Sequence, residues 1–115
     1  MSSYFEIRNK NNQLLHSGYF EKMKDCVADA VKNSKKLTGA QLAGYNMKGA
    51  NFAGGDFTGA DMTGCNLQGV NFAKATVSNM KIDGAGLKFS DFRGATQTQM
   101  SKMWLQYQEW CKGLT

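Results

Sequence analysis

The fold of this chain is decided by residues 37–93, which read LTGAQ LAGYN MKGAN FAGGD FTGAD MTGCN LQGVN FAKAT VSNMK IDGAG LKFSD FR. An apolar residue opens every group of five, and this period holds from Leu37 to Phe92 without a slip. A spacing of five fits neither regular element, because it moves apolar residues about 140° around a helix at each step and flips them across a strand. The chain must therefore bend once in every five residues.

The period of five predicts a square coil. If each repeat turns the backbone through a right angle, four repeats close one turn of twenty residues and every apolar side chain points inward. The twelve repeats then make about three stacked coils, which is an all-β solenoid. Stacking places residues twenty apart at about the ordinary strand spacing of 4.8 Å. It also predicts a phenylalanine ladder of Phe52, Phe72 and Phe92.

Glycine stands two positions after the central apolar residue in nine of the twelve repeats. This is the residue that a corner needs if it uses a positive φ, as in a type II turn. Lys74, Asn79 and Phe89 occupy the slot in the other three repeats. Asn tolerates the left-handed region, but Lys and Phe do so less readily, so we expect the corners at 74 and 89 to adopt another turn type.

Asn or Asp precedes the central apolar residue in seven repeats, and these residues are Asn46, Asn51, Asp56, Asp61, Asn66, Asn71 and Asp91. We expect their side chains to accept hydrogen bonds from nearby backbone amides at the turns. A catalytic or metal-binding array is the alternative, but carboxylates in such a site converge on one point. Residues five apart on a square coil face different directions, so the structural interpretation is favoured.

The N-terminal residues predict a hairpin followed by a helix. Apolar-rich segments at 4–8 and 14–20 are separated by a polar run, which favours a turn. Residues 21–34 contain no Gly or Pro and place apolar residues at helical spacing. We expect this helix to lie across the open end of the first coil. The predicted organisation is one compact domain with a hairpin and capping helix at 1–36, the repeat coil at 37–94 and a C-terminal helix at 95–115.

The C-terminal helix supports two compatible interpretations. Its apolar stripe comprises Met100, Met103, Trp104, Tyr107, Trp110, Cys111 and Leu114, at offsets of three and four. The stripe can cap the last coil. It can also form a dimer contact through Trp104, Leu105, Tyr107 and Trp110, because aromatic anchors are typical of interfaces. We therefore expect a homodimer.

Composition excludes several classes of function. The chain has one histidine and three widely spaced cysteines, so neither a zinc site nor a disulfide framework is expected. No apolar run approaches the length of a membrane span and no signal segment is evident, so we expect a cytoplasmic protein without membrane contact. The net charge is +5, but residues 37–94 carry five basic and four acidic residues and so only +1. Direct binding of nucleic acid is therefore not expected.

Several repeats resemble a known pattern. LTGAQ at 37–41, MKGAN at 47–51 and FTGAD at 57–61 are similar to the A(D/N)LxG repeat of pentapeptide-repeat proteins. The resemblance implies a right-handed quadrilateral β-helix. The hairpin and helix before it also resemble short pentapeptide proteins of phages and prophages. The resemblance further implies action by binding, since the best understood members are DNA mimics that engage bacterial topoisomerase II enzymes and often dimerise through C-terminal helices.

The leading functional hypothesis is a non-enzymatic, phage-derived protein-binding module. It would inhibit or modulate a host nucleic-acid-handling protein, such as a defence complex or a topoisomerase, by direct contact. Candidate partner-binding residues are Lys48, Lys88, Asp56 and Asp61, which place a charged patch on each side of the rod. The alternatives are a structural or assembly adaptor and an acidic DNA mimic, although the near-neutral repeats offer no row of charges to replace phosphates. No cofactor and no catalytic residue are expected, because no Ser-His-Asp or Cys-His pair lies close in the sequence.

Overall fold

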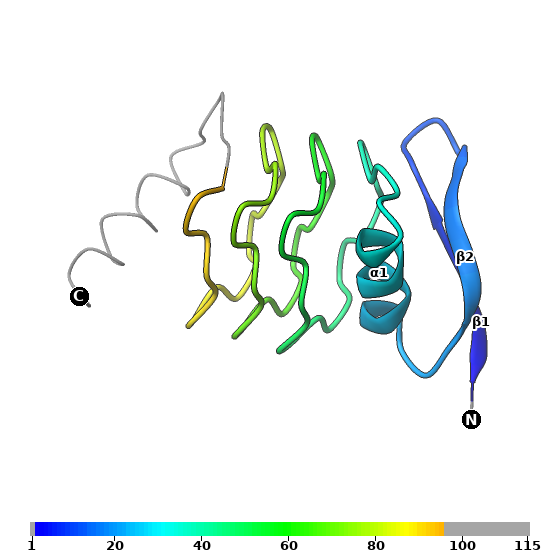
Figure 1. The fold of residues 1–115 in the computed structure, drawn as a ribbon, viewed down its shortest axis with the longest axis horizontal. Coiled ribbons are helices and arrows are strands. Elements are labelled where there is room, and N and C mark those ends of the chain that lie inside the picture. Colours follow the sequence, from blue (N-terminus) through cyan, green and yellow to red (C-terminus); the bar gives the residue numbers. More distant parts are fainter. Residues whose placement is uncertain (1, 96–115) are drawn as a thin grey trace.

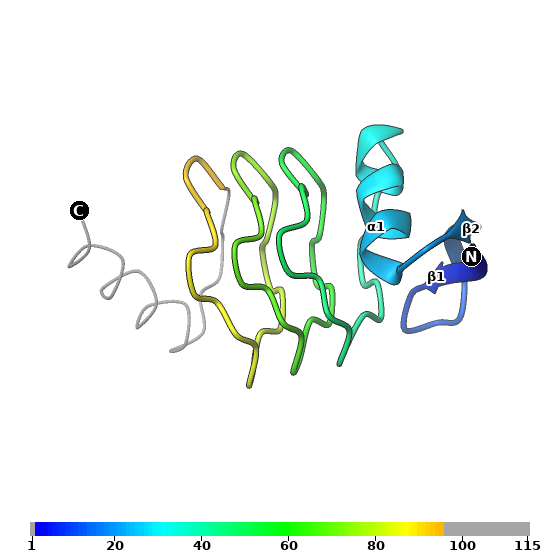
Figure 2. The same ribbon diagram turned by 90° about the horizontal axis from the view of Figure 1, so that it is seen from below.

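The computed structural model of the protein describes residues 2–95. The elements are β1 (Ser3–Arg8), β2 (Leu14–Phe20) and α1 (Met23–Lys32), and the repeats follow them. Figures 1 and 2 show the two strands and α1 at one end of a stack of successive chain turns. The predicted C-terminal helix lies outside the described residues, as do its proposed dimer contacts Trp104, Leu105, Tyr107 and Trp110.

The predicted hairpin is confirmed. β1 pairs antiparallel with β2, and Tyr4 lies opposite Tyr19. The Asn9 side chain closes the connection by accepting hydrogen bonds from the backbone N–H groups of residues 11 and 13. Ile7 on the inner face is fully buried, whereas the rings of Tyr4 and Tyr19 are exposed, with their centroids 5.3 Å apart. The hairpin therefore gives one face to the core and the other to solvent.

Helix α1 is shorter than predicted, since it runs from Met23 to Lys32 and not over 21–34. Ser34 adopts a positive φ of 59°. Its N–H donates to the carbonyl of Val31, and the N–H of Lys35 donates to the carbonyl of Ala30. This is the Schellman arrangement, which ends a helix and turns the chain away. Among residues 2–95 there is no helix with the length and apolar character needed to cross a membrane.

The repeats form four parallel ladders of backbone contacts. Residues twenty apart pair with one another, from Lys36 with Asp56 to Asn71 with Asp91. The corner residues add further rungs, because the N–H of Gly39, for example, donates to the carbonyl of Thr58 at 2.8 Å. Each repeat contributes only one bridged residue to a ladder, so the contacts remain isolated bridges and no long strand forms. The spacing is the one expected when four repeats make one turn.

The four sides of this stack, here called faces 1 to 4, each follow one ladder. Face 1 carries residues 36–38, 56–58 and 76–78; face 2 carries 41–43, 61–63 and 81–83; face 3 carries 46–48, 66–68 and 86–88; and face 4 carries 51–53, 71–73 and 91–93. The middle residue of each group is apolar and points inward, while its two neighbours in the group are more exposed. Each face therefore presents two columns of outer side chains.

All twelve corner residues have a positive φ, including Lys74, Asn79 and Phe89. The expectation that corners 74 and 89 use another turn type is wrong. The N–H of Lys74 donates to the carbonyl of Arg93 at 2.9 Å, and the turn closes between Ala75 and Phe72 at 3.0 Å. These bonds hold Lys74 in the conformation that glycine adopts elsewhere. They outweigh the roughly 1 to 2 kcal/mol that the left-handed region costs a residue with a Cβ.

The core contains more aromatic packing than the period predicts. Phe72 and Phe92 stack with centroids 4.8 Å apart and ring planes within 6°, as expected of a ladder. Phe52 instead meets Phe72 edge to face at 5.6 Å. Phe57, which belongs to face 1, contacts both Phe52 and Phe72. Aromatic pairs contribute roughly 0.5 to 1.5 kcal/mol each beyond area burial, so four such contacts are of the same order as the stability of a small domain.

The N-terminal elements join the first turn of repeats by hydrogen bonds and apolar contacts. The N–H of Gln41 donates to the carbonyl of Arg8 at 2.9 Å, which brings the end of β1 to the edge of face 2. The Lys24 ammonium donates to the carbonyl of Lys48 at 2.8 Å, which brings α1 to the edge of face 3. The buried residues of the hairpin, α1 and the repeats form one hydrophobic core cluster.

Gly55 marks a close approach of α1 to the repeats. A Cβ added there would lie 2.9 Å from Cγ2 of Val31 and 2.6 Å from Cε2 of Phe57. Most other repeats place a larger residue, often Ala, at this slot. The glycine is thus a signal in the sequence for the docking of α1, and the period of five does not contain it.

We predict that Gly55→Ala destabilises the protein by about 1 to 3 kcal/mol, because the added methyl overpacks the α1 junction. Adding Val31→Ala should recover part of this loss, since one of the two clashing groups is then removed. Urea unfolding followed by circular dichroism measures both. Gly86→Ala is the matched control, because a Cβ there meets only the Asn66 side chain, at 4.0 Å. Strictly additive effects of Gly55→Ala and Val31→Ala would contradict the proposed contact.

Candidate functional site

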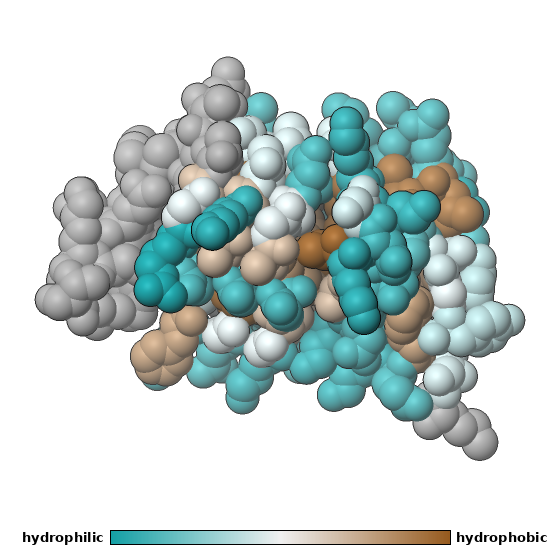
Figure 3. All heavy atoms as spheres, in the orientation of Figure 1, coloured by the Kyte–Doolittle hydropathy of each residue, from teal (hydrophilic) through white to brown (hydrophobic). Residues whose placement is uncertain are grey.

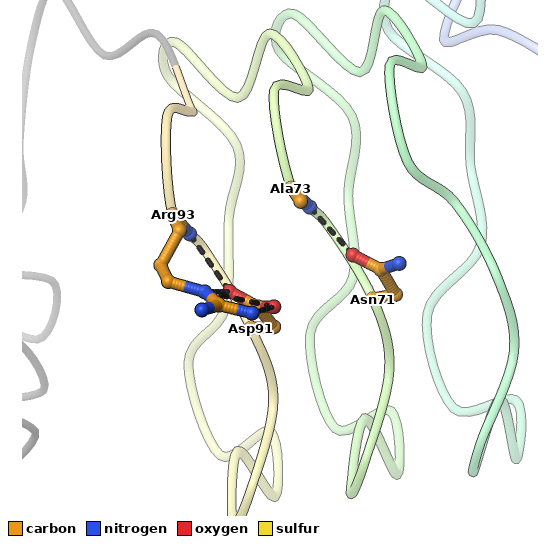
Figure 4. Close-up of polar contacts among 4 residues, drawn as sticks. All are labelled: Asn71, Ala73, Asp91 and Arg93. Carbon is orange, nitrogen blue, oxygen red and sulfur yellow. Dashed lines mark hydrogen bonds and ion pairs between the residues drawn. The ribbon is translucent and has the colours of Figure 1, made fainter.

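The seven Asn and Asp residues before the central positions all accept hydrogen bonds within their own turns. In each case Oδ1 accepts a hydrogen bond from the backbone N–H two residues later, at 2.8 to 3.1 Å. Figure 4 shows two successive examples on face 4, Asn71 with Ala73 and Asp91 with Arg93. The prediction that these side chains bond nearby amides is confirmed. Because Asn and Asp make the same bond, the turn itself does not require a charge.

Asp56 and Asp61 lie on adjacent faces of the stack. Asp56 on face 1 accepts hydrogen bonds from the N–H of Thr58 at 3.1 Å and from its hydroxyl at 2.7 Å. Asp61 on face 2 accepts one from the N–H of Thr63 at 2.9 Å. Both residues are half-buried. Each carboxylate is therefore held by its own turn, and the two do not converge on a shared point.

Local hydrogen bonds lower the pKa of two of the aspartates. The Thr63 side chain and then its backbone N–H hold the pKa of Asp61 below the ordinary value, and nearby Lys81 adds a smaller electrostatic effect. The guanidinium of Arg93 is the main cause of the lowered pKa of Asp91, to which it is bound by ion pair and hydrogen bonds (Figure 4). Both carboxylates are charged at neutral pH.

Lys48 and Lys88 lie in one column of face 3, with Gln68 between them. The structure adds a third cation, because the Lys24 ammonium of α1 reaches the backbone of Lys48. No pattern in the sequence places Lys24 there, since the contact depends on how α1 packs. The structure assigns acidic residues of the repeats to faces 1, 2 and 4, and among the described residues face 3 has none.

Two exposed aromatic side chains border face 3. Tyr45 precedes the face in the first turn and Phe89 follows it in the third, and they are 39% and 66% exposed. The ammonium of Lys88 lies 5.2 Å from the centre of the Phe89 ring. Face 3 and its borders therefore combine cations, side-chain amides and aromatic rings.

A groove of about 340 Å³ runs between α1 and face 4, and it is lined by Ala28, Val31, Lys32, Asn51 and Ala53. Figure 3 shows hydrophobic atoms in the hollow beside α1, within a surface that is otherwise mostly hydrophilic on this side. The lining offers one ammonium and one amide. The lining contains no carboxylate, hydroxyl, thiol or imidazole group.

The one histidine meets an aspartate beside a cysteine, but the group does not form a nucleophilic site. Nε2 of His16 lies 2.8 Å from Oδ2 of Asp29. The Cys26 thiol is completely buried, and burial together with the nearby Asp29 charge raises its pKa to about 11. The thiol is therefore protonated at neutral pH and closed to substrates. Within residues 2–95, no group of three His, Cys, Asp or Glu residues could hold a metal ion.

The lowered pKa of Asp61 predicts a dependence of stability on pH. Its contribution is fully present above the unfolded-state pKa of about 3.9 and is lost as the pH falls from there through the folded-state pKa. Asp61→Asn keeps the hydrogen bond to Thr63 and removes the titration, so acid should destabilise this variant less than the parent chain. Asp61→Ala should lose about 0.5 to 1.5 kcal/mol even at pH 7, because the acceptor is gone. Urea unfolding at pH 3 and pH 7 compares the three chains, and equal acid sensitivity of the parent and Asp61→Asn would contradict the assignment.

Comparison with known proteins identifies the repeats. The family model for pentapeptide repeats (9 copies) matches residues 37–81. The crystal structure of a pentapeptide repeat protein, Rfr23, from the cyanobacterium Cyanothece 51142 is similar to this chain, with a TM-score of 0.50 and 24% sequence identity. The similarity covers 51% of this chain and 40% of that one. A search among curated proteins found no match.

These comparisons agree with the bonding pattern of the repeats. The similarity to Rfr23 implies a right-handed β-helix. Pentapeptide repeats generally form a non-enzymatic structural fold, and the proteins that contain them often mediate protein interactions. The family model for pentapeptide repeats thus matches the part of this chain, residues 37–81, in which the period of five and the parallel ladders occur.

Proposed function

We propose that this chain is a non-enzymatic, phage-derived module that binds a host nucleic-acid-handling protein in the cytoplasm and inhibits or modulates it by direct contact. One observation carries the proposal. The central side chains of the repeats fill the interior, whereas the outer side chains stand in fixed columns on four faces. A scaffold of this kind offers preformed surfaces, and preorganisation lowers the entropic cost of association.

We propose in addition that the hairpin and α1 cap the first of about three coils. The edge of the first turn would otherwise expose unpaired backbone groups, which invite pairing with other chains. The bond from Gln41 to Arg8 satisfies part of this edge at face 2. Two contacts support this cap: Lys24 of α1 bonds to Lys48 on face 3, and α1 approaches Gly55 at the corner after face 4.

The distribution of acidic residues disfavours the alternative of a DNA mimic. Such a mimic needs rows of negative charge that follow a phosphate backbone. The acidic residues of the repeats are Asp56 on face 1, Asp61 and Asp83 on face 2 and Asp91 on face 4. No face of the described repeats carries an acid in all three turns. We therefore expect recognition by shape and by a few charges, and only a modest effect of salt on affinity.

We predict that the tagged full-length chain captures one bacterial protein stoichiometrically from lysate treated with nuclease, and that it lowers the activity of that protein. Lys48→Glu with Lys88→Glu tests the face 3 charges. Asp56→Asn with Asp61→Asn tests the acidic charges and keeps their turns intact. Capture without an effect on activity would favour the adaptor. Loss of binding only in the aspartate variant, together with a steep loss of affinity in salt, would favour the acidic mimic.

We also propose a homodimer formed through Trp104, Leu105, Tyr107 and Trp110, on the basis of their spacing in the sequence. Light scattering of the intact chain should give the mass of a dimer. Removal of residues 98–115 should give a monomer or an aggregating species, because an apolar contact has been lost. A monomeric mass for the intact chain at high concentration would refute the dimer.

A further inference from the structure

We infer that face 3 binds single-stranded nucleic acid, with its lysines on the phosphates and the rings of Tyr45 and Phe89 on the bases. This inference goes beyond the proposed function, which concerns a protein partner, and it rests on a different observation. The structure brings together on one surface residues that lie far apart in the sequence. They are Lys24 from α1, Tyr45 and Lys48 from the first turn, and Lys88 and Phe89 from the third.

The total charge of the repeats does not describe the charge of a single face. Residues 37–94 have a net charge of only +1. The described structure, however, places the four acidic residues of the repeats on faces 1, 2 and 4, and it places Lys48 and Lys88 together on face 3. Lys24 extends this row toward α1. The two cations of face 3 and the adjoining Lys24, with no carboxylate on face 3, are complementary to a phosphate backbone.

The aromatic side chains offer stacking surfaces for bases, which the lysines do not. Tyr45 and Phe89 are two of the five exposed large hydrophobic residues within the described part of the chain, and both stand at borders of face 3. Any of the bases can stack on an exposed aromatic ring, and such stacking contributes about 1 to 3 kcal/mol per base. The Lys88 ammonium beside the Phe89 ring adds a cation next to the stacking position. The amides of Asn66 and Gln68 lie between the two ends of the row.

The shape of the surface favours a single strand over a duplex. Bases in a duplex are read by a helix or a two-stranded ribbon that enters the major groove, and stacking requires bases that are unpaired. Within the described residues, face 3 is built from three short segments joined by bridges, one from each turn, and contains no helix or ribbon of its own. It can therefore meet a flexible strand along its length but cannot enter a groove.

The residue types favour nucleic acid over an acidic protein surface. Lysine is depleted at protein interfaces, where arginine and aromatic residues are enriched. Face 3 and its α1 neighbour carry three lysines and no arginine. Lysine is a mobile point charge that suits sequence-independent contact with phosphates.

The test measures fluorescence anisotropy of labelled oligo(dT) and oligo(U) of about 16 nucleotides with the full-length chain. Between about 50 and 200 mM salt, three phosphate contacts predict a slope of log K against log salt near −2. Lys48→Gln with Lys88→Gln should reduce this slope toward −1 and weaken binding at low salt. Tyr45→Ser and Phe89→Asn should each weaken binding by at least about fivefold. Asn at position 89 keeps the left-handed corner, as Asn79 does.

Matched controls separate this surface from general electrostatics. Lys74→Gln with Lys81→Gln removes the same charge outside face 3, and Tyr4→Ser with Tyr19→Ser removes exposed rings from the hairpin. Both control pairs should bind as the parent chain does, and all variants should share its melting temperature within a few degrees.

Three results would overturn the inference: no binding of either oligonucleotide by the parent chain, equal losses in the face 3 and control lysine pairs, or unchanged affinity in both aromatic variants. Loss of a captured protein from nuclease-treated lysate in Lys48→Gln with Lys88→Gln, with oligonucleotide affinity unchanged, would assign face 3 to that protein. Failure of capture alone would refute the proposed protein partner and leave the oligonucleotide result standing.

Discussion

The structure depends on a corner with positive φ at every fifth residue. At eleven of the twelve corners an amide closes the turn, and at the first eight corners the N–H of the corner residue donates to the carbonyl nineteen residues later, as from Lys74 to Arg93. The turn bonds and the ladder bonds support each other. The turn orients the amide of the corner residue toward the next coil turn, and the ladder bond of that amide stabilises the corner. Glycine meets the conformational demand at nine corners, and Lys74, Asn79 and Phe89 adopt the same positive φ at the remaining three. Regular hydrogen bonding therefore fixes the path of the chain, and no strand longer than an isolated bridge is needed in the repeats.

The period of five was enough to predict the stacking at twenty residues. A corner at every fifth residue closes a square after four repeats, so residues twenty apart must form the ladders. The turn role of Asp61 and its equivalents was also predictable, since Asn and Asp alternate there without regard to charge. The positive φ of Lys74 and Phe89 does not follow from the preferences of these residues, because it depends on bonds made by their neighbours in the structure. Lys74 is held by its ladder bond to Arg93, and the Phe89 corner is closed by the bond from Ser90 to Leu87. Contacts between helix α1 and the repeats also could not be predicted from the sequence, because the helix and the repeats have different periods. Lys24 joins face 3 and Val31 meets Gly55 only because a helix packs on a coil.

The fold and the candidate surface make separate demands on the sequence. Inward positions are restricted by volume, as the buried Phe52, Phe57 and Phe72 illustrate. The position after each central residue has its side chain outside the ladder, and it varies from Ala73 to Lys88 without any change in the turn. A charge or a ring can therefore be placed on one face at little cost to stability. For this reason the net charge of the repeats conceals the difference between face 3 and its neighbours.

The square repeat also constrains how such a protein can change in length. Deletion of a single repeat between Lys48 and Lys88 would preserve the period of five but would move every later residue onto a neighbouring face. Lys88 would then no longer share a side with Lys48, although the core would still be apolar. Only insertions or deletions of twenty residues leave each column in place. Evolution can therefore lengthen or shorten the coil in steps of five, but a binding surface that spans several turns is inherited intact only in steps of a whole turn.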